Sequence, residues 1–444
     1  MNTTFYDFIF KKKKDSEFGD AELANWNQQR KVFSRNDPNG YCLDGKQFLR
    51  EKYLFTHKLT LASTGAGKSV VIISHLLSLT AKSNTSCIVI DPSGEIRKIC
   101  EGHLSKYFKL RSLNLNDISK SEQYNPFENI ASENGIQEAI QLIIEGNDDF
   151  WTLSTRSIGE TMLYGLLNEQ QSEFPKNLNS FYKLVNLMSV EPDTVNEFMA
   201  TYLPKDKYLA YASFLSIEPK VRNSILATLK ASLAKLNSNV LQYITEQDSM
   251  EIQKLRKEKT ILFITCREDK ASKYYGFLLN LFLNQLIEYS LEMPEKEDLN
   301  LCFFLDEFAS FNLGAKSFPQ ILPILRRRRC AMFMYLQDIN QLTENYGQSG
   351  SKIILANALS KVIFGKGASL EVSKYAESLL GTTTEEVNGS LRPMSLLPAQ
   401  KLRAMKQWEF LFIYGGSHFQ LMKVKPYFKS HLKRRANLSI TKNN

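Results

Sequence analysis

A short glycine-rich segment in the first fifth of the chain constrains the fold more than any other feature. Residues 62–69 read Ala-Ser-Thr-Gly-Ala-Gly-Lys-Ser, which matches the phosphate-loop pattern Gly-x-x-x-x-Gly-Lys-Ser/Thr except that Ala62 replaces the first glycine. Small residues let such a loop curl so that its N–H groups point at phosphate oxygens, and the following helix adds its positive end. The segment therefore predicts a strand, a tight loop and a helix that bind a nucleoside triphosphate.

Each position of this loop carries a separate expectation. Lys68 is expected to reach the β- and γ-phosphates, and Ser69 to supply a hydroxyl for Mg²⁺. Gly65 and Gly67 keep the conformational freedom nearest the phosphates, whereas the methyl of Ala62 fits at the start of the loop if φ is negative there. The expected nucleotide-binding residues are Ser63, Thr64, Gly65, Ala66, Gly67, Lys68, Ser69 and Val70.

A second segment supplies the acidic groups that nucleotide hydrolysis needs. Leu301–Asp306 is an apolar run that ends in the carboxylates of Asp306 and Glu307. Without the upstream loop, a strand ending in a solvated acidic turn would be the simpler interpretation. With the loop, Asp306 is expected to hold the hydration shell of Mg²⁺ and Glu307 to polarise the attacking water.

Two further polar positions follow apolar runs. Gln337 ends the run that begins at Ala331, and parallel strands deliver their carboxyl ends to one rim of a sheet. Gln337 is therefore expected near the γ-phosphate, where it senses or orients water. Asp91 and Glu95 follow another run, but a turn of the form Asp-Pro-Ser-Gly explains them equally well.

The order of these runs predicts an α/β fold. Short apolar segments bounded by turn residues suit buried parallel strands, and helical stretches separate most of them. Between about residues 127 and 255 the strand signal fades and apolar residues recur at helical spacing, which indicates an inserted all-helical domain. The expected strands are Ser86–Asp91, Thr260–Thr265, Leu301–Asp306, Ala331–Gln337, Lys361–Phe364 and Phe410–Tyr414.

The charge and the cysteine content further restrict the kinds of partner, metal site and compartment that fit this chain. The net charge of +9 fits either an ordinary soluble surface or an anionic partner such as DNA or a membrane face. Basic residues gather at Lys11–Lys14, Arg326–Arg329 and Lys433–Arg435. None of the six cysteines forms a CxxC pair, so no zinc or haem site is expected and the thiols fit a reduced, cytosolic protein. No apolar stretch approaches about 18 residues, so no membrane-spanning helix is predicted.

Together these residues resemble the type IV coupling proteins, the TraG/TraD group of conjugative DNA-transfer ATPases. The resemblance spans roughly residues 54 to 428 in the family's order. Besides the loop, the segments that carry it are Asp91–Glu95, Tyr124–Phe127, Phe150–Trp151, Val221–Leu229, Leu305–Phe308, Tyr335–Asp338, Arg392–Met394 and Lys425–Phe428. The chain departs from the family in lacking the usual N-terminal transmembrane helices and in having Ala62.

The resemblance implies a RecA-like P-loop ATPase domain with a mainly parallel sheet, formed by residues 54–126 and 256–428. Residues 127–255 are expected to be the inserted all-α domain, residues 1–53 an N-terminal extension and residues 429–444 a basic C-terminal tail. It also implies ATP and Mg²⁺ as cofactors, a homo-hexamer, and three kinds of partner: single-stranded DNA, relaxase or relaxosome proteins, and type IV secretion channel proteins.

The protein is expected to be cytoplasmic, with any attachment to the inner face of the membrane provided by partner proteins. Two other functions remain open from the residues: a cytosolic DNA pump that is not tied to secretion, and a nucleotide-binding scaffold with little hydrolysis.

A ring-shaped motor also needs a cation delivered by the neighbouring subunit to the γ-phosphate. The candidates are Arg222 and the run Arg326, Arg327, Arg328 and Arg329. For the run, DNA backbone contact and plain surface solvation compete with this role.

Overall fold

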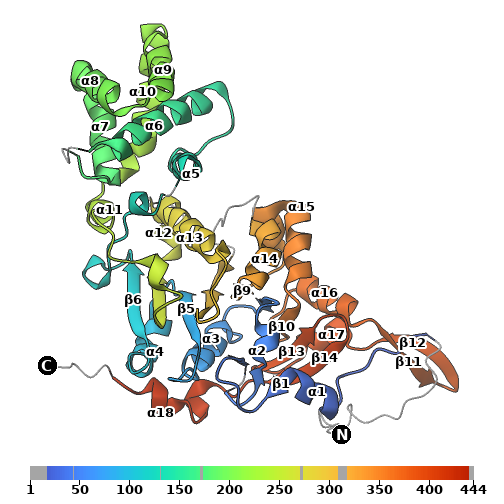
Figure 1. Cartoon of the computed structure of the whole chain (residues 1–444). Coiled ribbons are helices and arrows are strands. Elements are labelled where there is room, and N and C mark those ends of the chain that lie inside the picture. The colour runs from blue at the N-terminus through green and yellow to red at the C-terminus, as the bar shows by residue number, and fades with distance from the viewer. Residues whose placement is uncertain are drawn as a thin grey trace. The chain divides into compact units, whose positions relative to one another are not determined.

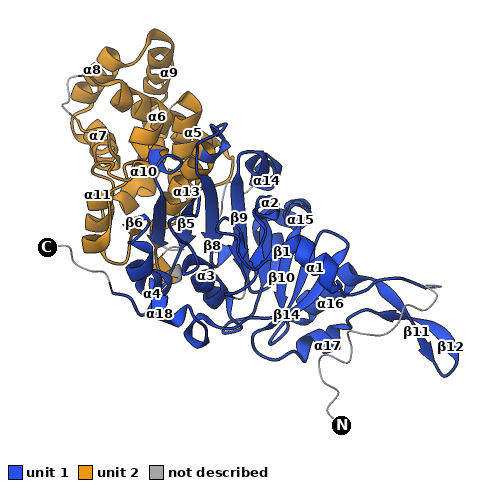
Figure 2. Ribbon diagram, turned by 60° about the horizontal axis from the view of Figure 1, so that its bottom comes forward, with its two compact units in different colours: residues 1–110, 254–264, 290–444 blue, residues 111–253, 265–289 orange. Residues whose placement is uncertain are grey.

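The structure is a computed structural model that describes residues 18–43, 45–130, 132–170, 174–270, 274–308 and 318–439. The Lys11–Lys14 run lies outside the described residues. Two compact units are distinguished, one of residues 1–110, 254–264 and 290–444 and the other of residues 111–253 and 265–289 (Figure 2). Each unit is considered by itself below.

A nine-stranded sheet forms the core of the fold, in the order β14-β13-β10-β4-β9-β8-β5-β7-β6 (Figure 1). The pairs β10–β4, β4–β9, β9–β8, β8–β5 and β5–β7 are parallel, whereas β13 and β14 add an antiparallel edge beside β10. The strands are β4 (Lys58–Leu61), β5 (Thr85–Ile90), β6 (Lys109–Asn114), β7 (Thr260–Thr265), β8 (Asn300–Leu305), β9 (Cys330–Leu336), β10 (Ser360–Phe364), β13 (Glu409–Tyr414) and β14 (His418–Lys423).

Burial explains why the sequence showed continuous apolar runs rather than alternation. Every residue of β5, β7, β8 and β9 is buried, because both faces of these central strands are covered. The six cysteines are buried free thiols, in agreement with the sequence interpretation. The predicted α/β class with a mainly parallel sheet is therefore confirmed, and the antiparallel strand β14 is an addition that the sequence did not reveal.

The first unit also contains helices, which precede, separate and follow the strands of the sheet in the sequence. They are α1 (Trp26–Val32), α2 (Glu51–Leu54), α3 (Lys68–Leu76), α4 (Glu95–Leu104), α14 (Phe318–Arg327), α15 (Asn340–Asn357), α16 (Leu370–Leu380), α17 (Ala399–Arg403) and α18 (Lys433–Ala436). A small sheet of β1 (Phe33–Ser34), β3 (Phe48–Leu49) and β2 (Tyr41–Cys42) and a hairpin of β11 (Thr382–Val387) and β12 (Ser390–Ser395) complete this unit.

The N-terminal and C-terminal segments both pack against the central sheet and helices of the first unit. Tyr41 is completely buried, and its hydroxyl lies 2.8 Å from that of Tyr335 in β9. At the other end, the Arg435 guanidinium donates to the carbonyl oxygen of Leu77, just after α3, at 2.7 Å. The basic run near the C-terminus is thus part of the folded unit in the residues that the structure describes.

The second unit is helical. It contains α5 (Glu133–Ile143), α6 (Phe150–Asn168), α7 (Leu178–Val190), α8 (Pro192–Tyr202), α9 (Lys205–Leu215), α10 (Pro219–Leu233), α11 (Asn239–Ile244), the short α12 (Glu268–Lys270) and most of α13 (Gly276–Leu291). Apolar side chains at helical spacing on α5 and α10 are buried, as expected of stripes that pack a core.

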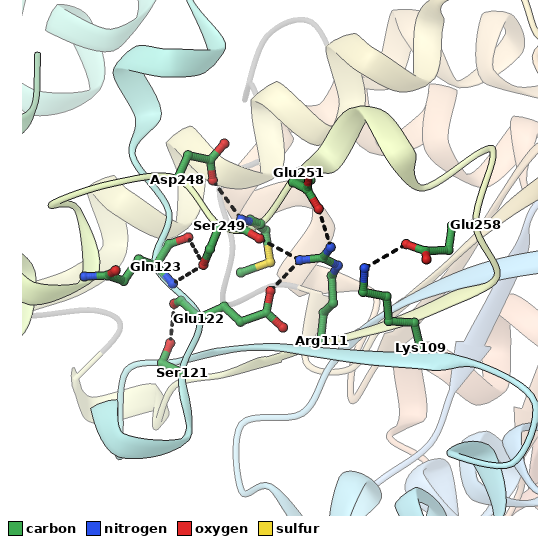
Figure 3. Close-up of polar contacts among 10 residues, drawn as sticks. Lys109, Arg111, Ser121, Glu122, Gln123, Asp248, Ser249, Glu251 and Glu258 are labelled. Atoms are coloured by element: carbon green, nitrogen blue, oxygen red, sulfur yellow. Dashed lines mark hydrogen bonds and ion pairs between the residues drawn. The ribbon is translucent and has the colours of Figure 1, made fainter.

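A buried arginine links the two ends of residues 111–253, the longer of the two segments that form this helical unit. Arg111, only 5% exposed, lies where the chain enters the unit. Its guanidinium pairs with Glu122 at 2.6 Å and with Glu251 at 2.8 Å, and donates to the Ser249 carbonyl oxygen at 2.6 Å (Figure 3). The incoming segment, which contains Glu122, is thereby fastened to the outgoing one. A buried charge of this kind is stable only because both carboxylates compensate it.

No helix in the described part of the chain is long and apolar enough to cross a membrane.

Candidate nucleotide site

The phosphate loop connects β4 to α3 as the sequence predicts. Gly65 has φ 74° and Gly67 has φ 127°, backbone conformations that residues with a Cβ rarely adopt. The N–H of Ala66 donates to the Ser63 carbonyl oxygen at 3.0 Å and closes the turn. Because α3 begins at Lys68, the N–H groups of its first turn have no partner within the helix and are available to an anion.

Ala62 fits the loop without strain. It is not among the described residues with positive φ, and its N–H donates to the Leu336 carbonyl oxygen at 3.0 Å, which extends the pairing of β4 with β9. Its side chain is buried, with 2% of the residue exposed. The methyl in place of the usual glycine is therefore accommodated as an extra apolar contact.

The two carboxylates at the end of β8 face the loop. Asp306 Oδ2 accepts a hydrogen bond from Ser69 Oγ at 3.4 Å, and Glu307 Oε1 accepts one from Lys68 Nζ. Glu307 has φ 52°, a left-handed conformation that is uncommon for residues other than glycine. This backbone strain at the end of β8 is consistent with a side chain held in place for function.

Asp306 lies in a largely dehydrated position. Burial, together with the nearby charge of Glu307, raises the pKa of its carboxyl to about 6, against the opposing charge of Lys68. A hydroxyl and a carboxylate are oxygen donors of the kind that Mg²⁺ prefers. Ser69 and Asp306 therefore fit a magnesium ion chemically.

Gln337 reaches the same place from the neighbouring strand. It follows β9, and its side-chain amide donates to both Glu307 oxygens at 3.2 Å while its carbonyl oxygen accepts from Thr64 Oγ1 at 3.3 Å. The Gln341 side chain accepts from the Gln337 N–H at 3.0 Å and so fixes this strand end. The structure thus brings together Thr64, Lys68, Ser69, Asp306, Glu307 and Gln337, all predicted site residues.

Residues next to β10 and β13 also contact the phosphate loop, and the sequence did not single them out. An ideal Cβ placed on Gly67 would lie 2.8 Å from the indole of Trp408, and Gln407 donates to the Gly65 carbonyl oxygen at 3.4 Å. Ser63 Oγ donates to the Lys366 carbonyl oxygen at 3.0 Å. Lys366 could have been found, because it follows the predicted strand Lys361–Phe364 at the same rim. Trp408 carries no such local signal.

Asp91 serves the turn that follows β5. Its carboxylate accepts from the Arg97 N–H at 2.8 Å, at the start of α4, and its carbonyl oxygen accepts from the Gly94 N–H at 3.1 Å. Burial raises the pKa of this carboxyl, and the hydrogen bonds from the α4 turn oppose that shift. Between the two interpretations of Asp91, these contacts favour the structural one.

The arginine run divides into two pairs. Arg328 Nε donates to the Leu291 carbonyl oxygen at 2.7 Å, and Arg329 donates to the Glu295 carbonyl oxygen, so both hold the segment before β8. Arg326 and Arg327 are exposed at the end of α14. The run precedes β9, at the amino edge of the sheet. It therefore lies about 20 Å, the length of that strand, from the rim that bears Gln337.

Arg222 belongs to the helical unit. It lies in the first turn of α10, and its guanidinium donates to the carbonyl oxygen of Leu215, the last residue of α9. In this position it satisfies a helix carbonyl that lacks a partner within the helix.

The fold and the site together define a P-loop nucleotide hydrolase. Residues 11–400 match the sequence model of the family described as Type IV secretory system Conjugative DNA transfer. The chain therefore belongs to that family, and it is a P-loop ATPase that links DNA to type IV secretion. The sequence resemblance, the fold class and the type of enzyme are thereby confirmed.

Solved structures show the same fold. The bacterial conjugative coupling protein TrwBΔN70, in complex with sulphate, has a TM-score of 0.70 at 16% identity, covering 91% of this chain and 93% of that chain. The plasmid coupling protein TrwB with ADP and Mg²⁺ has a TM-score of 0.69 at 16% identity, with the same coverage. VirB4 of Thermoanaerobacter pseudethanolicus has a TM-score of 0.57 at 13% identity, covering 89% of this chain and 99% of that chain. A search of curated proteins found no match.

Proposed function

We propose that this ATPase hydrolyses ATP with Mg²⁺ at the phosphate loop and uses each cycle to move single-stranded DNA toward a type IV secretion channel. One observation carries the proposal: Lys68, Glu307 and Gln337 converge by direct hydrogen bonds at one rim of the sheet, in a chain of the conjugative DNA transfer family. The solved relatives named for ADP, Mg²⁺ and an ATP analogue support the choice of nucleotide and metal.

The chain's own residues divide the work of binding. The backbone of Ser63–Val70 would surround the phosphates, and Ser69 and Asp306 would hold a magnesium ion. The ion neutralises charge on the phosphate oxygens when it is bound. Burial of Asp306 makes its ionised form costly, so a neighbouring cation stabilises that form.

Hydrolysis requires Glu307 to be free of Lys68. In the structure the Lys68 ammonium donates to Glu307. On substrate binding, Lys68 turns its hydrogen bond to a phosphate oxygen, which leaves the Glu307 carboxylate available to accept a proton from the attacking water. Gln337 donates to both oxygens of Glu307 and orients that carboxylate.

The predicted domain limits are retained as part of the proposal. Residues 54–126 and 256–428 form the RecA-like motor, with residues 127–255 as the helical insertion, residues 1–53 as an extension and residues 429–444 as a C-terminal segment. In a homo-hexamer, Arg326 and Arg327 are the best candidates for the cation supplied to a neighbour, because they are exposed. Arg222, Arg328 and Arg329 are engaged with backbone carbonyls.

The partners in the proposal follow from the family. The chain receives DNA from a relaxase or relaxosome and delivers it to type IV secretion channel proteins, and it works in the cytoplasm at the inner face of the membrane through those partners.

The decisive experiment measures ATP turnover by the purified chain with and without single-stranded DNA, across a range of salt concentrations. We expect turnover to rise with DNA and the stimulation to decline with salt, because phosphate contacts release counterions. Lys68→Ala serves as the inactive control. Turnover that ignores DNA, together with no salt-sensitive DNA binding, would refute the DNA motor. The absence of turnover in any condition would favour the scaffold.

A further inference from the structure

A groove of about 1080 Å³ lies in the first unit, apart from the nucleotide site. Its walls come from α1, from residues around β3, from the turn after α3 and from the segment that starts α18. Residues within 26–50, 78–80 and 431–435, which are separated in the sequence, thus build one concavity.

The charge of this groove is one-sided. Six basic or potentially basic residues line it, and none of the described residues that line it is acidic. They are Arg30, Arg35, Lys46, Arg50, His431 and Arg435. The net charge of the whole chain is only +9, so this concentration of cations in one hollow exceeds what an evenly charged surface would give.

Two of these arginines are fixed and two are presented at the surface. Arg50 donates to the Arg30 carbonyl oxygen at 3.2 Å, and Arg435 donates to the Leu77 carbonyl oxygen at 2.7 Å. The side chains of Arg30 and Arg35 are exposed. The guanidinium of Arg30 lies 4.3 Å from the ring centroid of Trp26, which is 65% exposed.

At the α18 end of the groove, nearby cations lower the pKa of a histidine. Partial burial lowers the pKa of His431, and the charges of Arg435, Lys46 and Lys425 lower it further. Cations from three separate stretches of the chain are therefore close enough to repel a proton. An anion bound among them would relieve this repulsion.

We propose that this groove binds the phosphodiester backbone of a short run of single-stranded DNA, with Arg30 and Arg35 contacting phosphates and Trp26 offering an exposed ring to a base. The inference rests on the proposed DNA motor and adds to it a binding site outside the nucleotide pocket. A hollow lined by cations and edged by an aromatic ring suits a threaded single strand, whose bases stack on aromatic side chains. A flat membrane surface would reach the exposed rim of the groove and leave its interior unused.

The groove and the nucleotide site lie at opposite ends of one helix. Ser78, which lines the groove, follows α3 closely, whereas Lys68 begins it. The nine residues of α3 separate them by about 13 Å along the helix axis. Substitutions at Arg30 and Arg35 therefore leave the basal ATPase machinery intact.

The test compares the wild-type chain with the double variant Arg30→Gln, Arg35→Gln. Binding of a fluorescent oligothymidylate of about 20 nucleotides is followed by anisotropy over a range of salt concentrations. The loss of two phosphate contacts is expected to weaken binding roughly tenfold or more near 0.1 M salt and to reduce the salt slope by about 1.4. The control variant Lys352→Gln, Lys374→Gln removes two exposed charges from α15 and α16.

Each possible result of this comparison either supports or overturns the proposed DNA-binding groove. Weaker binding by the groove variant alone, with unchanged basal turnover, supports the inference. Equal binding by wild type and groove variant, or equal losses in both variants, overturns it. Vesicles of phosphatidylglycerol and phosphatidylcholine form a second arm: loss of vesicle binding with intact DNA binding assigns the groove to lipid headgroups instead. If the wild-type chain binds no DNA, the proposed function itself fails, which is a separate outcome.

Discussion

The Lys68 ammonium donates a hydrogen bond to the Glu307 carboxylate across the phosphate loop. Both side chains are largely shielded from solvent, with 8% and 17% of their surfaces exposed. The two groups to which the proposed mechanism assigns hydrolysis are therefore held together before they act. Exchange of this contact for a phosphate contact is the step that we expect to activate Glu307.

Glu307→Gln is expected to abolish turnover while preserving ATP binding. The amide cannot take a proton from water, and general-base catalysis typically contributes about 10²- to 10⁴-fold. Steady-state ATP hydrolysis and equilibrium binding of a fluorescent ATP analogue would check both halves. A variant that hydrolyses ATP at the wild-type rate would remove Glu307 from its proposed role.

Gly67→Ala is expected to weaken nucleotide binding far more than Gly65→Ala. At Gly67 the new Cβ would lie 2.8 Å from Trp408 at φ 127°, whereas at Gly65 nothing lies within 4 Å. Both variants bear the backbone strain of positive φ, roughly 1–3 kcal/mol, but only Gly67→Ala adds a collision. Titration with a nucleotide analogue would measure the difference, and equal losses would argue against a role for Trp408 in shaping the loop.

Asp306→Asn is expected to stabilise the protein at pH 8 while destroying its activity. The pKa of this carboxyl is raised to about 6 in the folded chain from an ordinary value of 3.8. Ionisation therefore costs folded-state stability, beginning near pH 4 and complete above pH 6, by roughly 2–3 kcal/mol. Thermal unfolding across this pH range should show the stabilisation disappear near pH 4. A gain that does not depend on pH would contradict this explanation.

Arg111→Met is expected to destabilise the helical unit by about 1.5–3 kcal/mol, because it removes the charge-assisted hydrogen bonds of a buried guanidinium to Glu122 and Glu251. Urea unfolding followed by circular dichroism would measure the loss. Lys109→Met is the matched control: its ion pair with Glu258 is nearly half exposed and should contribute less than about 1 kcal/mol (Figure 3). Similar effects of the two substitutions would refute the special role of Arg111.

Arg328→Ala and Arg327→Ala are expected to differ in their effect on the stability of the folded chain. Arg328 donates to the Leu291 carbonyl oxygen, so its removal should cost about 1–2 kcal/mol of stability. Arg327 is exposed, and its removal should leave the melting temperature unchanged. Calorimetry on both variants would reveal this contrast. A stable Arg328→Ala protein would instead leave Arg328 available for work between subunits.

The sequence by itself determined the central strands, the phosphate loop and the acidic strand end. Strands covered on both faces must be apolar at every position, so they appear as continuous runs in the sequence. A loop that curls around phosphates needs small residues at fixed spacing, which is a purely local demand. Parallel pairing then sends Asp306 and Gln337 to one rim, as the predicted fold class requires.

Only the tertiary structure decided which distant residues meet. Trp408 reaches Gly67 because β13 runs antiparallel to β10 and its start therefore lies at the same rim as the phosphate loop. The run Arg326–Arg329 is uniform in sequence, yet Arg328 and Arg329 hold backbone carbonyls while the other two face solvent. The basic groove is lined by residues of α1 and by residues around the start of α18, about 400 positions apart in the chain. Local patterns encode burial and turn geometry, whereas these contacts depend on strand order and packing, which no short segment specifies.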